Sequence, residues 1–87
     1  MSHTTVVRRR MEAVINRVLA ESGRPPRVYT DHDRLAETIG LDSLDLAQAV
    51  VSLEREFGID PFREGASRVA TFGELVSLYE RALGRSD

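Results

Sequence analysis

The heptapeptide Gly-Leu-Asp-Ser-Leu-Asp-Leu, residues 40–46, predicts the start of a helix with a serine at its first position. Asp42 is a residue type that caps helix N-termini by accepting hydrogen bonds from free backbone amides. Asp45 places negative charge in the first turn, which the helix dipole favours. Gly58 is the next residue suited to end the helix. We therefore expect a helix over residues 43–57, with the serine hydroxyl free at its N-terminus.

This helix carries two apolar stripes. One has the i, i+4, i+7, i+11 spacing of a face that packs on the core, and consists of Leu46, Val50, Leu53 and Phe57. The other consists of Leu44, Ala47 and Val51. Two interpretations of the second stripe stay open: it packs in the core beneath a long loop, or it forms a partly exposed docking patch. In the second interpretation the patch has a polar rim of Asp45, Gln48, Glu54 and Arg55.

The rest of the chain predicts further helices and one long connection. Apolar periodicity and a following glycine indicate a helix over residues 5–22, which Pro25 and Pro26 prevent from continuing. Residues 24–41 lack periodicity, so we expect a loop pinned to the core by Leu35 and Ile39, with a short turn at residues 34–38.

Two helices are expected after Gly58. Residues 63–69 are predicted to form a short helix with Val69 turned inward. Thr71 and Glu74 match a capping box, which predicts a last helix over residues 72–83. The expected fold is therefore all-α: a small four-helix bundle of three main helices and one short helix, forming a single domain over residues 1–87.

Composition excludes several classes of protein. The 87 residues suffice for one small domain, and the absence of cysteine excludes disulfides and thiolate metal sites. No apolar run is long enough to span a membrane, and no apolar segment follows the arginines at residues 8–10, so a cytoplasmic location is expected.

Charge is distributed unevenly along the chain. Residues 1–28 hold six arginines and two acids, whereas residues 29–60 hold eight acids and two arginines. The acidic block would steer basic partner surfaces toward Ser43. The basic first helix alone does not indicate a nucleic-acid binder, because the pI is about 5.7 and no second basic helix joins it.

The residues around Ser43 do not match those that activate a catalytic serine. The only histidines are His3 and His32, and the G-x-S-x-G pattern of the hydrolase elbow is absent. Residues 31–33, Asp-His-Asp, are too few to hold a metal ion. The first turn of a helix instead suits a phosphate-linked group, because its backbone amides are unpaired and its dipole favours an anion. We expect no enzyme activity and no metal site.

The chain resembles the acyl carrier protein family over nearly its whole length. The resemblance is carried by Asp-Ser-Leu at residues 42–44 and Leu-Glu-Arg-Glu-Phe-Gly at residues 53–58. It implies that Ser43 receives 4′-phosphopantetheine from coenzyme A through a phosphopantetheinyl transferase. It also implies that the arm holds acyl groups as thioesters for delivery to a ketosynthase and other acyl-processing enzymes. A monomer is expected.

The resemblance also implies roles for the residues that follow the serine. Partner enzymes are expected to contact Asp42, Leu44, Asp45, Gln48, Val51, Glu54 and Arg55. An acyl chain that folds back into the bundle is expected to lie against Leu46, Val50 and later apolar residues.

The chain departs from the pattern of general fatty-acid carriers at a few positions. Gln48 and Arg55 stand where those proteins usually have acids, residues 60–63 replace an acidic stretch, and the first helix is basic. These departures favour a carrier of a specialised polyketide, polyene or fatty-acid-like pathway. One alternative is a peptidyl or aminoacyl carrier of a nonribosomal pathway, although Leu41 and Asp42 differ from the glycine-rich lead of that class. Another is an interaction domain of the same fold whose serine stays unmodified.

Overall fold

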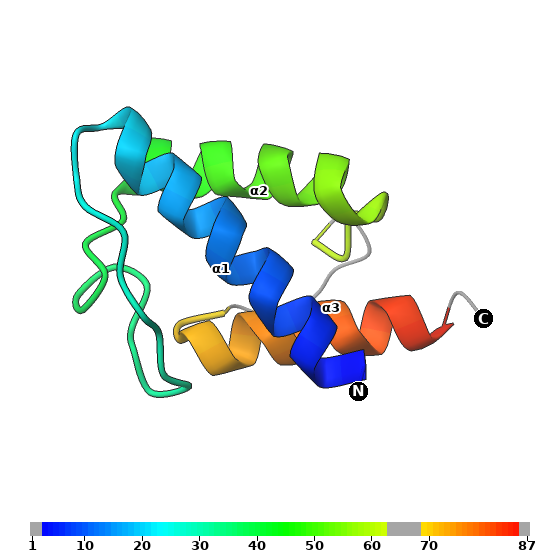
Figure 1. The fold of residues 1–87 in the computed structure, drawn as a ribbon. Coiled ribbons are helices and arrows are strands. Elements are labelled where there is room, and N and C mark those ends of the chain that lie inside the picture. The colour runs from blue at the N-terminus through cyan, green and yellow to red at the C-terminus, as the bar shows by residue number, and fades with distance from the viewer. Residues whose placement is uncertain (1–2, 63–68, 86–87) are drawn as a thin grey trace.

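The computed structural model describes residues 3–62 and 69–85, and within them the chain forms three helices (Figure 1). Helix α1 spans His3–Glu21, α2 spans Ser43–Phe57 and α3 spans Phe72–Arg85. In this part of the chain α1 packs against both other helices, whereas no Cα atoms of α2 and α3 lie within 8 Å of each other. These two helices meet through side chains, as in the contact between the rings of Phe57 and Tyr79, whose centroids are 5.3 Å apart.

The helix ends follow the signals in the sequence. Helix α2 has the predicted bounds, and it ends at Gly58, whose left-handed φ of 72° is a conformation that favours glycine. The Gly58 amide donates to the Glu54 carbonyl at 2.8 Å. Helix α1 begins two residues before the predicted start, and α3 continues two residues past the predicted end at residue 83.

The start of α3 forms the predicted capping box. The amide of Glu74 donates to the Thr71 hydroxyl at 3.2 Å, and the Glu74 carboxylate accepts from the amides of Thr71 and Ala70 at 3.0 and 2.9 Å. These backbone hydrogen bonds lower the pKa of Glu74.

The long connection between α1 and α2 is fastened to the core, as predicted. Leu35 and Ile39 are buried, and the Arg34 carbonyl accepts from the amides of Thr38 and Ile39 at 3.0 Å, which confirms the turn at residues 34–38. At its start, the Asn16 side chain of α1 accepts a hydrogen bond from the Tyr29 hydroxyl at 2.6 Å. The Tyr29 ring stacks on Phe72 with a centroid distance of 4.9 Å.

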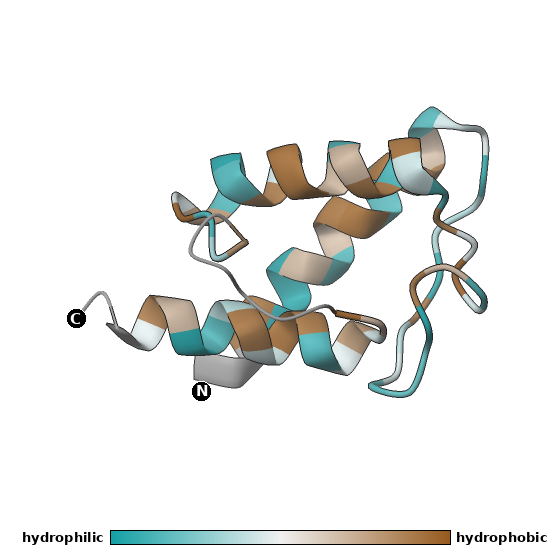
Figure 2. Cartoon of the chain, turned by 180° about the vertical axis from the view of Figure 1, so that it is seen from behind, coloured by the Kyte–Doolittle hydropathy of each residue, from teal (hydrophilic) through white to brown (hydrophobic). Residues whose placement is uncertain are grey.

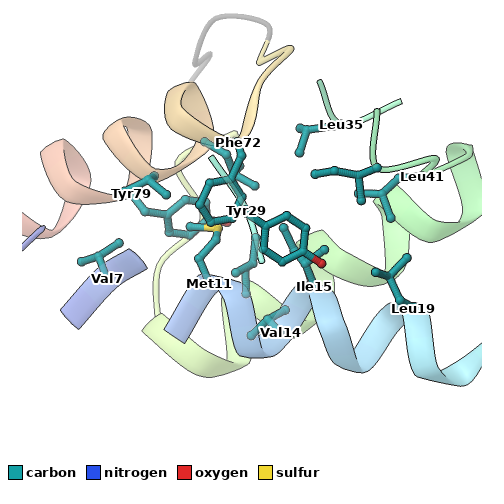
Figure 3. Packing of buried hydrophobic residues seen from close by; sticks show 14 residues of the cluster. Val7, Met11, Val14, Ile15, Leu19, Tyr29, Leu35, Leu41, Phe72 and Tyr79 are labelled. Atoms are coloured by element: carbon teal, nitrogen blue, oxygen red, sulfur yellow. The ribbon is translucent and has the colours of Figure 1, made fainter. Parts of the chain in front are cut away.

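The core collects apolar side chains from all three helices and from the loop (Figure 3). Figure 2 shows hydrophobic residues along α2 and α3, with more hydrophilic residues in the long loop. The largest fully buried side chains come mainly from α1 and α3, and include Met11, Ile15, Leu19, Phe72 and Tyr79. Burial of these side chains is the main stabilising contribution to the fold.

The structure confirms an all-helical fold, with three helices in the described residues. The predicted short helix falls on residues 63–68, which lie outside the described residues, and on Val69. Val69 is described, is not helical and packs against the core. An isolated antiparallel bridge joins Arg34 to Thr71, and so ties the long loop to the start of α3.

Candidate functional site

Ser43 is the first residue of α2, and its side chain is exposed. Asp42 before it is the N-cap, in extended backbone conformation, and its carboxylate accepts a hydrogen bond from the Asp45 amide at 2.8 Å. In the described part of the chain, no group hydrogen-bonds to the Ser43 hydroxyl or to the amides of Ser43 and Leu44. The serine therefore lies beside unpaired backbone donors at the positive end of the helix dipole, which favours an attached anion.

The first turn of α2 is closed by a reciprocal pair of aspartates. While Asp42 accepts from the Asp45 amide, the Asp42 amide donates to the Asp45 carboxylate at 3.2 Å. This is a capping box in which an aspartate replaces the more common glutamate. It confirms the predicted cap and fixes the backbone on either side of Ser43.

Arg24 clamps this turn to the end of α1. Its guanidinium donates to the Ser22 hydroxyl at 2.8 Å, the Gly40 carbonyl at 2.7 Å and the Asp45 carboxylate at 2.6 Å. One side chain thus joins the end of α1, the segment that precedes α2 and the first turn of α2. Charge-assisted hydrogen bonds of this kind are stronger than neutral ones.

The Asp45 carboxylate is consequently occupied by hydrogen bonds within the domain. Only 8% of it is exposed, and the hydrogen bond from Arg24, followed by that from the Asp42 amide, holds the pKa of its carboxyl below the ordinary value. The sequence predicted Asp45 on the rim of a docking patch. In the structure Asp45 is buried in the first turn of α2, and its contact with a partner stays a prediction.

The segment that leads into α2 is also held. Gly40 has a φ of +84°, a conformation that favours glycine, and Leu41 is buried with its amide donating to the Leu35 carbonyl at 3.0 Å. Because Gly40, Leu41 and Asp42 are all anchored, Ser43 projects from a fixed turn although its own side chain is free.

The outer face of α2 is exposed. Leu44 is 68% exposed and Val51 50% exposed, and Ala47 between them is also exposed. The interpretation in which this stripe packs in the core beneath the loop is therefore wrong, because the long loop lies elsewhere and leaves the stripe uncovered. An apolar stripe exposed on a small domain is typical of a docking surface.

Polar side chains border this stripe on both edges. Gln48, Glu54 and Arg55 are exposed, as predicted. A shallow groove of about 310 Å³ runs along the edge nearer α1, between Glu21 of α1 and Gln48 and Arg55 of α2. At 100° per residue, Glu54 lies on the opposite edge of the stripe from Gln48 and Arg55. On α2 itself, one edge therefore carries an acid and the other carries Gln48 and Arg55, whereas Glu21 of α1 adds an acid beyond the second edge.

The inner face of α2 borders a cavity of about 180 Å³. Leu46 and Val50, which the sequence assigned to the acyl-chain site, line it from α2 and are half-buried. Ala49 and Leu53 line it as well, and both are buried. Ala49 was not predicted, because it belongs to neither apolar stripe.

The described residues offer no catalytic or metal-binding arrangement. His32 is exposed in the long loop and makes no described contact with Ser43. Among the residues that the structure describes, no group of three or more His, Cys, Asp or Glu side chains is placed to hold a metal ion. No helix in the described ranges is long and apolar enough to cross a membrane.

Comparison with known proteins agrees with this geometry. Residues 12–79 match the family model described as "Phosphopantetheine attachment site". The chain is 36% identical over 55 residues to an acyl carrier protein of Thermotoga maritima, an alignment that covers 63% of this chain and 68% of the relative. It is 34% identical over 55 residues to an acyl carrier protein of Wolinella succinogenes, covering 63% of this chain and 72% of that relative. No solved structure matches the chain significantly.

Proposed function

Because the chain belongs to the phosphopantetheine attachment-site family and is an acyl-carrier-type domain, we propose that Ser43 is the residue that receives the 4′-phosphopantetheine arm. The observation that supports this most directly is the free, exposed hydroxyl on an anchored first turn. The unpaired amides of Ser43 and Leu44 fit a phosphodiester at this position.

Proteins of this family are carriers and not enzymes, and they hold 4′-phosphopantetheine covalently. When attached, the arm supplies a thiol that forms thioesters with acyl groups, which this cysteine-free chain does not itself provide. The chain's own contribution is to hold Ser43 in place, through the aspartate capping box and the Arg24 clamp, and to offer surfaces to the enzymes that act on the acyl group.

The outer face of α2 is the proposed docking surface for a phosphopantetheinyl transferase, a ketosynthase and other acyl-processing enzymes. Its exposed apolar stripe begins next to Ser43 at Leu44 and ends at Val51, so an enzyme seated there has the attachment site within reach. Asp42 and Glu54 supply acidic contacts, whereas Gln48 and Arg55 supply neutral and basic ones.

This mixed rim supports a carrier of a specialised polyketide or fatty-acid-like pathway. A partner that docks on a uniformly acidic helix presents basic side chains throughout, and Arg55 would repel one of them. The pathway, the cytoplasmic location and the monomeric state are parts of this proposal.

Ser43 modification is tested by mass spectrometry of the intact protein. The chain is incubated with coenzyme A and a broad-specificity phosphopantetheinyl transferase. We expect the mass of one phosphopantetheine to be gained by the wild type and by Ser52→Ala, a matched serine on the same helix, but not by Ser43→Ala. If the wild type stays unmodified while a control carrier is loaded, Ser43 is not an attachment site.

A further inference from the structure

Arg24 is held at both ends, so its guanidinium has a fixed place. Its backbone amide donates to the Leu19 carbonyl at 2.9 Å, directly after α1, and the proline that follows restricts its backbone. At the other end, the guanidinium Nε donates to the Ser22 hydroxyl at 2.8 Å. That hydroxyl in turn donates to the Leu19 carbonyl at 3.1 Å. The end of α1 therefore orients this side chain before it reaches α2.

The two remaining nitrogens of the guanidinium reach the chain on either side of Ser43. Nη1 donates to the Gly40 carbonyl at 2.7 Å, before the serine, and Nη2 donates to the Asp45 carboxylate at 2.6 Å, after it. A guanidinium holds its donors in a rigid planar fork, so the two acceptors cannot shift apart without breaking a contact. Arg24 thus fixes both ends of the segment that carries Ser43.

The contact with Asp45 also acts on the capping box. The same carboxylate oxygen, Oδ2 of Asp45, accepts from Arg24 and from the Asp42 amide, the latter at 3.2 Å. Arg24 therefore stabilises the orientation of the Asp45 side chain in which the box is closed. Because Ser43 lies between the two aspartates, loss of the Arg24 contact should loosen the backbone on both sides of the serine.

The same contact withdraws Asp45 from the docking surface. An acidic side chain in the first turn, beside an exposed apolar stripe, would ordinarily be available to a basic side chain of a partner. Asp45 is only 8% exposed, and its carboxylate is already paired with a cation of its own chain. Asp42, in contrast, is exposed. Of the two acids at this turn, Asp42 is therefore the one that a partner can reach.

We propose that Arg24 occupies Asp45 in place of a partner's basic residue, and that the two are positioning residues for the attachment of the arm to Ser43. They act through the first turn of α2, which they hold in the geometry that presents the Ser43 hydroxyl to the transferase. Docking then depends on the outer face of α2, and the orientation of the serine depends on this pair. The inference rests on the proposed attachment at Ser43.

The kinetic test measures kcat and KM of a broad-specificity phosphopantetheinyl transferase with this chain and coenzyme A as substrates. Arg24→Met and Asp45→Asn should each lower kcat roughly 10-fold and change KM by less than about twofold, because a misplaced hydroxyl slows transfer after binding has taken place. The double variant should lose no more of kcat than the more affected single variant, since the two residues act as one unit.

Arg27→Met is the matched control. Arg27 follows Arg24 after two prolines and donates to the Thr38 carbonyl at 2.9 Å, so it also holds the long loop but does not contact α2 in the described structure. Its kcat should equal that of the wild type. Circular dichroism and Tm show that each variant is folded at the assay temperature. A general loss of loop structure would lower kcat in Arg24→Met and Arg27→Met alike, and would overturn the proposal.

A docking role of Asp45 gives the opposite kinetic pattern. Asp45→Asn would then raise KM, whereas Arg24→Met would lower it by exposing the carboxylate. Either change in KM, or an unchanged kcat in both variants, would overturn the proposal.

Hydrogen exchange tests the pair without any attachment, and so separates its failure from a failure of Ser43 to accept the arm. The amides of Asp42 and Asp45 donate within the capping box, and in unmodified Arg24→Met they should exchange roughly 10-fold faster than in the wild type. The amide of Gly58, at the far end of α2, should keep its rate. Unchanged exchange at Asp42 and Asp45 would overturn the proposal even if Ser43 is modified.

Discussion

The two faces of α2 are built from similar apolar residues, yet the rest of the domain covers one face and leaves the other exposed. The inner face, with Leu46, Ala49, Val50 and Leu53, faces α1, the long loop and the cavity. The outer face, with Leu44, Ala47 and Val51, is covered by nothing in the described part of the chain. An apolar residue on the inner face therefore contributes mainly to stability, whereas one on the outer face is available for a partner. Adjacent valines at positions 50 and 51 fall on opposite sides of this division.

The largest expected effect is a difference in the free energy of unfolding between Leu53→Ala on the inner face and Val51→Ala on the outer face. Leu53 is 1% exposed, so its truncation leaves a cavity and should lower the free energy of unfolding by about 2–5 kcal/mol. Val51 is half-exposed, and Val51→Ala should change the free energy of unfolding by less than about 0.5 kcal/mol. Urea denaturation measures both. Equal losses would remove the distinction between the two faces.

The next effect concerns docking. Val51→Asp places a charge in the apolar stripe and should lower kcat/KM for modification by the transferase about 5- to 30-fold, which corresponds to a loss of about 1–2 kcal/mol at the interface. Val28→Asp makes the same change at an exposed loop valine and should leave kcat/KM unchanged. Circular dichroism and Tm check that both variants stay folded. If Val51→Asp instead unfolds the domain, the outer stripe contributes to the core after all.

A smaller, pH-dependent effect on stability is expected at the first turn of α2, where Arg24 binds Asp45. The hydrogen bond from Arg24 lowers the folded-state pKa of Asp45 below the ordinary value of 3.8. Its stabilising contribution is therefore complete above that value and is lost as the pH falls through the lower folded-state pKa. Asp45→Asn should have a lower Tm than the wild type at neutral pH, and the gap should narrow in acid. In an Arg24→Met background the gap should be smaller at every pH. A gap that does not change with pH would contradict the role of this pair.

The smallest effect is expected where the inner face of α2 ends. Phe57 packs on Tyr79, whose hydroxyl is buried without a hydrogen-bond partner in the described structure, and burial raises the pKa of Tyr79 to about 12. Tyr79→Phe removes only this unsatisfied group, so the free energy of unfolding should stay the same or rise by up to about 1 kcal/mol. A clear loss of stability in urea denaturation would show that the hydroxyl has a partner.

Local signals in the sequence predicted much of this fold. The bounds of α2, the Asp42 cap and the Thr71 capping box follow from short-range hydrogen bonds, and the structure confirms each of them. The spacing of apolar residues also separated the two faces of α2. It did not reveal which face is covered, because that depends on where the long loop lies.

Contacts between distant residues account for what the sequence did not predict. Arg24 and Asp45 are 21 positions apart, and no periodic pattern links them. The only local signal was an arginine between the glycine that ends α1 and two prolines. The same contact explains why Asp45 is buried although its position in the first turn predicted an exposed acid. Ala49 was overlooked because a small residue gives little apolar signal, although it forms part of the cavity wall.

The central claim is that Ser43 carries the arm, and it is tested most directly by locating the modification within the chain. Trypsin cleaves after Arg34 and Arg55, and the peptide of residues 35–55 contains both Ser43 and Ser52. After incubation with coenzyme A and the transferase, fragment ions of this peptide should place one phosphopantetheine on Ser43 and leave Ser52 unmodified. An arm on Ser52, or an unmodified peptide from a reaction in which a control carrier is fully loaded, would contradict the account.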